Sequence, residues 1–213
     1  MNAQGRLHPM LYCDINMIYK NSNKIYTAAQ YSTDKTTFIR NHITTVWTSL
    51  CNTIVKSDIY IKHHLSSPEH LCYCEDFWLS VRLFHYANKV AYVNKAFYNY
   101  NRENETSTMH SLSYKTEQNE RKAYLETINF FCLEGVEKEY EREMSWRILK
   151  STHDSIFHRE RYEEFLTIYP ESHKLIWTCP YVNLKTKTLM WMLTHHLKII
   201  ALSIIKLRKI LGR

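Results

Sequence analysis

The sequence predicts an α/β fold, with strands near its beginning and helices over its second half. The run MLYCDINMIY at 10–19 is apolar and rich in β-favouring residues, which is typical of a strand. Apolar residues from Asp76 onward recur at helical spacing, and from about Thr116 the whole pattern is helical. A chain of 213 residues is long enough for one domain with a substantial core.

The first sixty residues predict a strand pair followed by a helix. After the strand at 10–19, the polar segment at 21–24 indicates a turn, and residues 25–31 favour a second strand. Thr33 or Asp34 is suited to cap the helix that follows. The apolar residues at mostly helical spacing in this helix are Phe38, Ile39, Ile43, Val46 and Leu50.

A second helix and two further strands are expected after a loop at 63–70. Apolar residues from Phe77 recur at i, i+4 and i+7 with others beside them, which predicts a helix buried on more than one side. Two short strands should follow at 90–93 and 96–100, separated by the polar pair at 94–95.

The remainder of the chain is predicted to be helical. A polar loop at 101–108 precedes it, and a proline within 168–177 interrupts it before another short helix. Residues 186–211 predict one basic, strongly apolar helix. The expected parts are a sheet-containing portion at 1–112, a helical extension at 113–184 and a basic amphipathic helix at 185–213.

The positive charge of the chain belongs to its last segment. The formal net charge is +7, and residues 185–213 contain seven basic residues and no Asp or Glu. The other 21 basic and 21 acidic residues lie in 1–184 and balance. The charge therefore bears on the partner of this segment alone. Its basic residues are Lys185, Lys187, Lys198, Lys206, Arg208, Lys209 and Arg213.

Glycine and cysteine usage excludes several classes of site. Three glycines, with neither GxGxxG nor a P-loop lysine motif, argue against a glycine-rich phosphate loop. The six cysteines follow no apparent export signal, so we expect reduced thiols. The C-x-C at Cys72 and Cys74 has no second cysteine pair to complete a zinc site, which favours structural thiols over a metal site.

A pair of carboxylates, Glu75 and Asp76, lies at a predicted loop-to-helix junction. Acidic residues are common in a first helical turn because the helix dipole favours them there, and Asp is a good cap. Two adjacent carboxylates also raise each other's proton affinity, which suits acid–base chemistry. From the pair alone, both a capping role and a catalytic role remain open.

The sequence around this pair resembles family-2 glycosyltransferases, which are inverting enzymes of the GT-A fold. The resemblance lies in three segments in order: a tryptophan-containing run at 46–60, the glutamate–aspartate pair with the strand-like region that follows at 74–108, and helices from Thr116. It covers roughly 10–110 in register and is looser to about 180. It implies an incomplete GT-A-like mixed sheet with flanking helices, followed by a helical C-terminal region.

The resemblance implies a sugar-transfer mechanism with an aspartate base. Asp76 would take the proton of an acceptor hydroxyl, and Glu75 would bind the acceptor or tune the pair. Trp47 would offer a flat face to an acceptor sugar, although plain core packing explains it equally well. The residues placed near the donor diphosphate are Arg102, Ser107 and Thr108, where arginine suits a diphosphate because its planar fork donates two hydrogen bonds.

The chain departs from the family pattern at two places. Relatives usually carry glycine before the carboxylate pair, and here the residue is Cys74. The D-x-D motif that holds a divalent cation is absent, the nearest match being Asp14-Ile15-Asn16. We therefore expect a C-terminal, acceptor-side portion without its nucleotide-binding half, with Mg²⁺ or Mn²⁺ involved only if that half is supplied.

The partners and location follow from these interpretations. A nucleotide-sugar donor and a saccharide or lipid-linked saccharide acceptor are expected from the resemblance. The basic segment at 185–213 favours an anionic membrane surface, hence a cytoplasmic protein at the inner face of the cell membrane, or else a helix packed on its own domain. The alternatives are an inactive remnant or interaction subunit and, with less support, a nucleic-acid-binding module.

Overall fold

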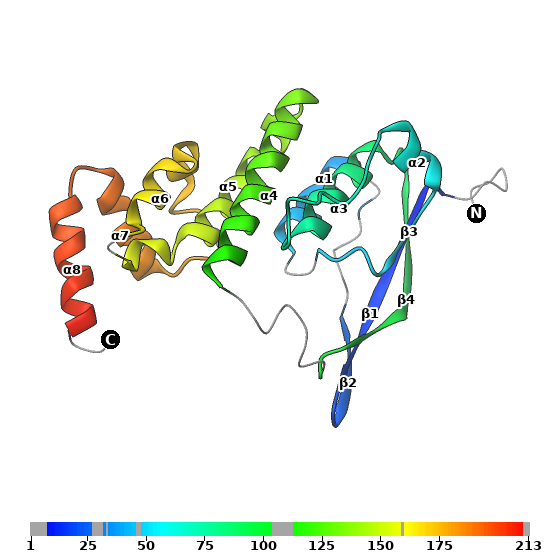
Figure 1. The fold of residues 1–213 in the computed structure, drawn as a ribbon, viewed down its shortest axis with the longest axis horizontal. Coiled ribbons are helices and arrows are strands. Elements are labelled where there is room, and N and C mark those ends of the chain that lie inside the picture. Colours follow the sequence, from blue (N-terminus) through cyan, green and yellow to red (C-terminus); the bar gives the residue numbers. More distant parts are fainter. Residues whose placement is uncertain are drawn as a thin grey trace. The chain divides into compact units, whose positions relative to one another are not determined.

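The chain forms a mixed α/β fold with helices toward its C-terminus, which confirms the predicted fold class. The computed structural model divides it into two compact units, residues 1–133 and 134–213 (Figure 1). The sheet lies in the first unit. The residues that the structure describes are 8–26, 32, 34–45, 48–103, 113–158 and 160–210.

A four-stranded mixed sheet is organised around β1 (Met10–Tyr19), which pairs along both edges. On one edge, β2 (Ser22–Tyr26) and β3 (Thr53–Val55) run antiparallel to it. On the other edge, β4 (Val90–Asn101) runs parallel. The β1–β2 turn is shorter than predicted, because Ser22 already pairs with Tyr19 and only two residues close the hairpin.

The polar pair at 94–95 makes a bulge in β4 rather than a break between two strands. Cys13 lies opposite Val93, but the next residue, Asp14, lies opposite Ala96. The extra residues are accommodated in the ladder, so one long strand replaces the two short strands that were predicted.

The register shift changes which residues of β1 are buried. Met10 and Tyr12 are buried before it, and Ile15 and Met17 are buried after it. The register with β4 shifts twice here, past residues 94–95 and then past Phe97. Side chains alternate with period two along a strand, so the irregularity between Tyr12 and Ile15 lets both buried pairs lie on the helix-covered face. Asp14, at the shift itself, is also buried.

The first helix, α1 (Lys35–Thr44), is capped as predicted but ends sooner. The Asp34 carboxylate accepts a hydrogen bond from the backbone N–H of Thr37 at 2.7 Å. At the other end, the Thr44 hydroxyl bonds the carbonyls of Arg40 and Asn41, and Thr45 is extended. Such side-chain competition disfavours helix continuation, and the chain instead leads to β3 and a short helix, α2 (Ser57–Lys62).

Helix α3 (Glu75–Tyr86) packs against both α1 and α4 (Tyr114–Leu133). Edge-to-face aromatic contacts join them: Phe84 meets Phe38 of α1 at 4.7 Å between ring centroids, and Phe77 meets Tyr124 of α4 at 5.0 Å. The helix is therefore buried on more than one side, as its sequence predicts.

Arg82 ties α3 to α4 from within the packed interface. Its guanidinium donates to the Trp78 carbonyl at 2.7 Å and to the Glu126 carbonyl at 3.1 Å. It also lies 3.5 Å from the centroid of the Trp78 ring and 4.6 Å from that of Phe130. Burial lowers the pKa of Arg82 to about 10, so the group stays charged at neutral pH.

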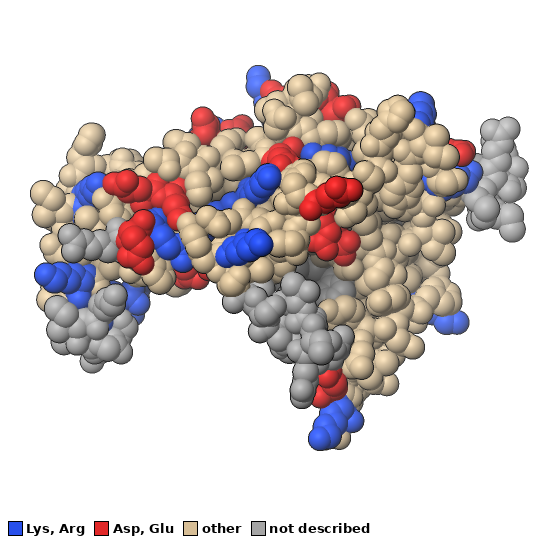
Figure 2. Space-filling model, viewed as in Figure 1, with Lys and Arg blue, Asp and Glu red and all other residues tan. Residues whose placement is uncertain are grey.

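The sheet also carries exposed apolar side chains, including Ile25 on β2, Ile54 on β3 and Phe97 on β4. Figure 2 shows a largely uncharged surface where β1 and β4 lie. Within the described chain, this surface lacks the apolar cover that α1 and α3 give to the buried residues of β1.

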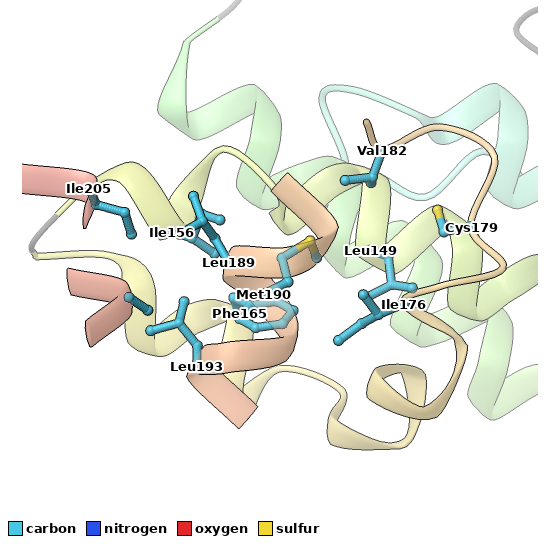
Figure 3. Close-up of a cluster of buried hydrophobic side chains, with 11 residues drawn as sticks. Leu149, Ile156, Phe165, Ile176, Cys179, Val182, Leu189, Met190, Leu193 and Ile205 are labelled. Carbon is cyan, nitrogen blue, oxygen red and sulfur yellow. The ribbon is translucent and has the colours of Figure 1, made fainter. Parts of the chain in front are cut away.

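The second unit is helical around its own apolar core (Figure 3). Its elements are α5 (Glu137–Thr152), η2 (Ser155–Phe157), α6 (Tyr162–Thr167), η3 (Pro170–Leu175), α7 (Leu184–Thr194) and α8 (Lys198–Ile210). In the described segments, no helix has both the length and the apolar content to cross a membrane.

The single helix predicted at 186–211 is two helices, because the chain turns after α7. His196 has a left-handed backbone, with φ of 60°, and the Leu197 N–H bonds the Met192 carbonyl at 3.1 Å. A left-handed residue followed by this bond is the helix ending of the Schellman type, here with histidine where glycine is usual. The predicted three-part division at 112 and 184 stays a prediction beside the two units seen here.

We expect Arg82→Lys to lower the free energy of unfolding by about 2 kcal/mol, because lysine cannot reach both carbonyls or stack its charge flat on Trp78. Urea denaturation followed by circular dichroism measures this. Arg102→Lys, a partly exposed control in the same unit, should change stability by less than about 0.5 kcal/mol. Equal losses in both variants would contradict the role of Arg82.

Candidate active site

The two carboxylates predicted to be functional, Glu75 and Asp76, form the first turn of α3. The residue before them, Cys74, has φ of 63° and ψ of 17°, a left-handed conformation that favours glycine. Glycine is the residue type expected here from the resemblance, and the backbone gives the physical reason. Since Cys74 carries no side-chain cap, the helix start depends on this backbone turn.

A short loop at 48–52 faces this helix start and is anchored on β1. The Asn52 side chain donates to the Cys13 carbonyl at 2.6 Å, and the Cys13 N–H bonds the Asn52 carbonyl at 3.0 Å. Thr53 fixes the next residues, because its N–H and its hydroxyl both bond the Leu50 carbonyl. The loop is thus held at a defined distance from α3.

The loop donates two hydrogen bonds to one carboxylate oxygen of Asp76. Oδ2 accepts a hydrogen bond from the Ser49 hydroxyl at 3.0 Å and another from the Leu50 N–H at 3.3 Å. Oδ1 takes no hydrogen bond from the described residues. A half-buried carboxylate can act as a proton acceptor where one of its oxygens takes no hydrogen bond from the protein.

The Asp76 carboxylate contributes to the raised pKa values of weakly acidic side chains around it. Burial, and then the Asp76 carboxylate, raise the pKa of the Cys51 thiol, although the Ser49 hydroxyl opposes this. The pKa of Tyr98 is raised mainly by Cys51, with which it is hydrogen-bonded, and that of Tyr60 mainly by burial. The raised pKa values of Cys51, Tyr60 and Tyr98 favour their protonated, uncharged forms at neutral pH.

Glu75 contributes to the raised pKa of a different tyrosine, Tyr73. Burial raises the pKa of Tyr73 to about 12, with smaller contributions from nearby acidic groups that include Glu120 and Glu75. The two members of the pair therefore have different surroundings. Asp76 accepts hydrogen bonds from the 48–52 loop, whereas Glu75 lies near Tyr73.

The other predicted site residues are not gathered here. Arg102 lies just beyond β4, four residues past Tyr98, which places it about 13 Å along the strand direction from the Asp76 cluster. Its guanidinium lies 5.9 Å from the Tyr100 ring. Trp47, Ser107 and Thr108 lie outside the described residues, so their predicted roles stay predictions.

The nearest match to a D-x-D motif is already occupied by protein contacts. Asp14 is buried and accepts a hydrogen bond from the Tyr92 hydroxyl at 2.7 Å, while Asn16 donates to Asn99 at 3.0 Å. Burial, followed by the bond to Asp14, raises the pKa of Tyr92 to about 12. Across the described ranges, no group of three His, Cys, Asp or Glu residues could hold a metal ion.

Sequence reasoning missed the residues that surround Asp76, of which Ser49 is the one whose side chain bonds it. Ser49 and Cys51 were expected to fall within or after a long helix, and Tyr98 was expected only as a strand residue. Ser49 lies 27 positions from Asp76 in the chain, and a two-residue contact of this kind has no local sequence pattern. The available signal for this loop was that Trp47, a predicted acceptor-binding residue, directly precedes it in the sequence.

The chain has a glycosyltransferase-like fold, as the comparison with solved structures shows. It is similar to Staphylococcus aureus TarS, a glycosyltransferase, in the crystal structure of residues 1–349 in complex with UDP-GlcNAc. The TM-score is 0.52 at 15% identity, with 97% of this chain and 60% of that chain covered. A second structure of TarS 1–349 gives a TM-score of 0.49 at 15% identity, with 97% and 59% covered.

This chain therefore spans about 60% of the length of the TarS structure that it matches. Neither the known protein-family models nor the curated protein sequences give a match. The similarity establishes the fold alone.

We expect Cys74→Gly to raise the free energy of unfolding by about 0.5–1 kcal/mol, because glycine removes the left-handed penalty at a smaller entropic cost. Cys74→Ala keeps the β-carbon and should bring no such gain. Chemical denaturation of both variants makes the comparison. An equal gain in both would trace the effect to the thiol instead of the backbone.

We also expect Asp76→Asn to lower the pKa of Cys51, because a negative charge that disfavours the thiolate is removed. Alkylation by iodoacetamide, measured by mass spectrometry across a pH series, reports the midpoint for each cysteine. The Cys51 midpoint should fall in the variant, and labelling of the exposed Cys72 serves as the internal control for reagent and protein concentration. An unchanged Cys51 midpoint would contradict the described proximity.

Proposed function

We propose that this chain carries the acceptor side and the catalytic base of a family-2 type, inverting glycosyltransferase. The observation that supports this most directly is the state of Asp76. One of its oxygens is held by Ser49 and the Leu50 N–H, and the other has no hydrogen bond from the described residues. The glycosyltransferase-like fold gives this carboxylate a chemical context.

The proposed step is a single displacement. An acceptor hydroxyl gives its proton to Asp76 Oδ1 as its oxygen forms a bond to the anomeric carbon of the donor sugar. The bond from that carbon to the nucleotide diphosphate breaks, and the diphosphate leaves with the electron pair. Attack opposite the leaving group inverts the anomeric configuration. Ser49 and Leu50 keep the carboxylate oriented, and Glu75 contacts the acceptor or tunes the pair.

The donor in this proposal is a nucleotide sugar. The matched TarS structure contains UDP-GlcNAc, which supports this class of donor without identifying the sugar. Trp47 is proposed to bind the acceptor, and Arg102, Ser107 and Thr108 to bind the donor diphosphate. Asp14 and Asn16 are engaged by Tyr92 and Asn99, so they do not fit a D-x-D metal site, and no step is assigned to a metal here.

The alternative is an inactive remnant or interaction subunit that keeps the fold. In that case the integrity of the chain would matter, but the chemistry of Asp76 would not. The two proposals therefore differ in their response to a substitution that preserves the shape of the side chain while removing its ability to accept a proton.

We expect Asp76→Asn, introduced at the chromosomal gene, to reduce the sugar product to the level of a gene deletion. Loss of a general base costs about 100- to 10,000-fold in rate. Mass spectrometry of surface and lipid-linked saccharides measures the product. Asp58→Asn, the same change at an exposed position on α2, is the matched control and should leave the product intact.

Two outcomes would contradict the proposal in different ways. If deletion alters the saccharides and Asp76→Asn does not, the chain acts as an interaction subunit. If neither deletion nor substitution alters any saccharide, sugar transfer is not its function. Immunoblotting confirms that each variant accumulates to the normal level.

A further inference from the structure

Helix α8 has two apolar faces, of which one is used inside the second unit. Ala201 and Ile205 are buried, and Figure 3 shows Ile205 with Leu193 of α7 among the core side chains. Around this face, Lys198 lies 4.7 Å from the Tyr162 ring and Arg208 lies 5.1 Å from the Phe157 ring. These contacts fix the rotation of α8 about its axis.

The opposite face of α8 is apolar and exposed. At about 100° per residue, the exposed aliphatic side chains of this face and Ser203 fall within an arc of about 140° around the helix axis. Exposure of this arc is a consequence of the fixed rotation, since the buried positions lie on the other side of the helix. The aliphatic residues and their exposed fractions are Ile199 at 83%, Ile200 at 50%, Ile204 at 37% and Leu207 at 57%.

The segment that carries this arc is basic, and the acidic Glu163 of α6 lies 3.9 Å from Lys198, on the packed side of α8. Lys206 is exposed at its edge, and the whole segment 185–213 contains seven basic residues and no acidic residue. An apolar face with an exposed lysine at its edge, on a segment without acidic residues, matches the two layers of an anionic bilayer, in which hydrocarbon lies beneath negative headgroups.

A second copy of the chain fits this surface less well. The face of a 13-residue helix is about 20 Å long and 10 Å wide, or about 200 Å². A stable protein interface buries about 800 Å² on each partner. Pairing two such faces would also bring segments of the same positive charge together, whereas a bilayer places negative charge there.

We propose that the exposed face of α8, formed by Ile199, Ile200, Ile204 and Leu207, docks the chain on an anionic membrane surface. The helix lies in the plane of the headgroups while Ala201 and Ile205 keep it attached to the second unit. Docking therefore needs no unfolding of the helical core. This inference goes beyond sugar transfer and holds or fails independently of it.

Co-sedimentation of the purified full chain with vesicles tests the proposal. We expect binding to phosphatidylcholine–phosphatidylglycerol vesicles at a 3:1 ratio and at least about tenfold weaker binding to phosphatidylcholine alone. Ile204→Glu with Leu207→Glu should weaken binding at least about tenfold, since both apolar contacts are lost and negative charge is added. Lys206→Gln should weaken it about fivefold.

The matched control is Ile61→Glu with Leu133→Glu, two exposed aliphatic residues of the first unit. It makes the same change in charge and composition and should leave vesicle binding unchanged. Circular dichroism confirms that both double variants keep their helices. Absence of binding by the unmodified chain, or equal losses in both double variants, would overturn the proposal. Self-association abolished only by the α8 variant would instead identify a second copy as the occupant, which also overturns it.

Discussion

The hydrogen bond from the Asn52 side chain to the Cys13 carbonyl is the contact on which the site depends. It joins the loop at 48–52 to the central strand β1 where that strand changes register with β4. Because the same loop supplies both donors to Asp76, the sheet fixes the carboxylate indirectly. A local defect in the sheet ladder thus lies next to the residues that orient the proposed base, as is common for bulges beside functional sites.

Much of the fold could be predicted because its signals are local. The strand at 10–19 and the cap at Asp34 were found in place, since alternating burial and side-chain capping act over a few residues. The start of α3 at the carboxylate pair was predicted for the same reason. The end of α1 was missed because the backward bonds of the Thr44 hydroxyl outweigh the continuing apolar pattern.

The site was predictable only in its central pair. Asp76 stands out as a carboxylate at a helix start, but the residues that bond it lie in a loop 26 and 27 positions earlier. The turn between α7 and α8 was not predictable from the sequence either. It depends on a left-handed histidine, a position where glycine would have indicated a break and His196 did not.

The bulge at 94–95 has a consequence for solubility. Within the described chain, β4 pairs only with β1, so its outer edge presents peptide groups that another strand could join. Lys95 lies in the bulge with its ammonium 5.3 Å from the Phe97 ring, beside the exposed apolar surface of the sheet. A kinked edge bearing a lysine resists edge-to-edge pairing between molecules. The same irregularity that makes one strand look like two in the sequence is thus of the kind that disfavours pairing between sheet edges.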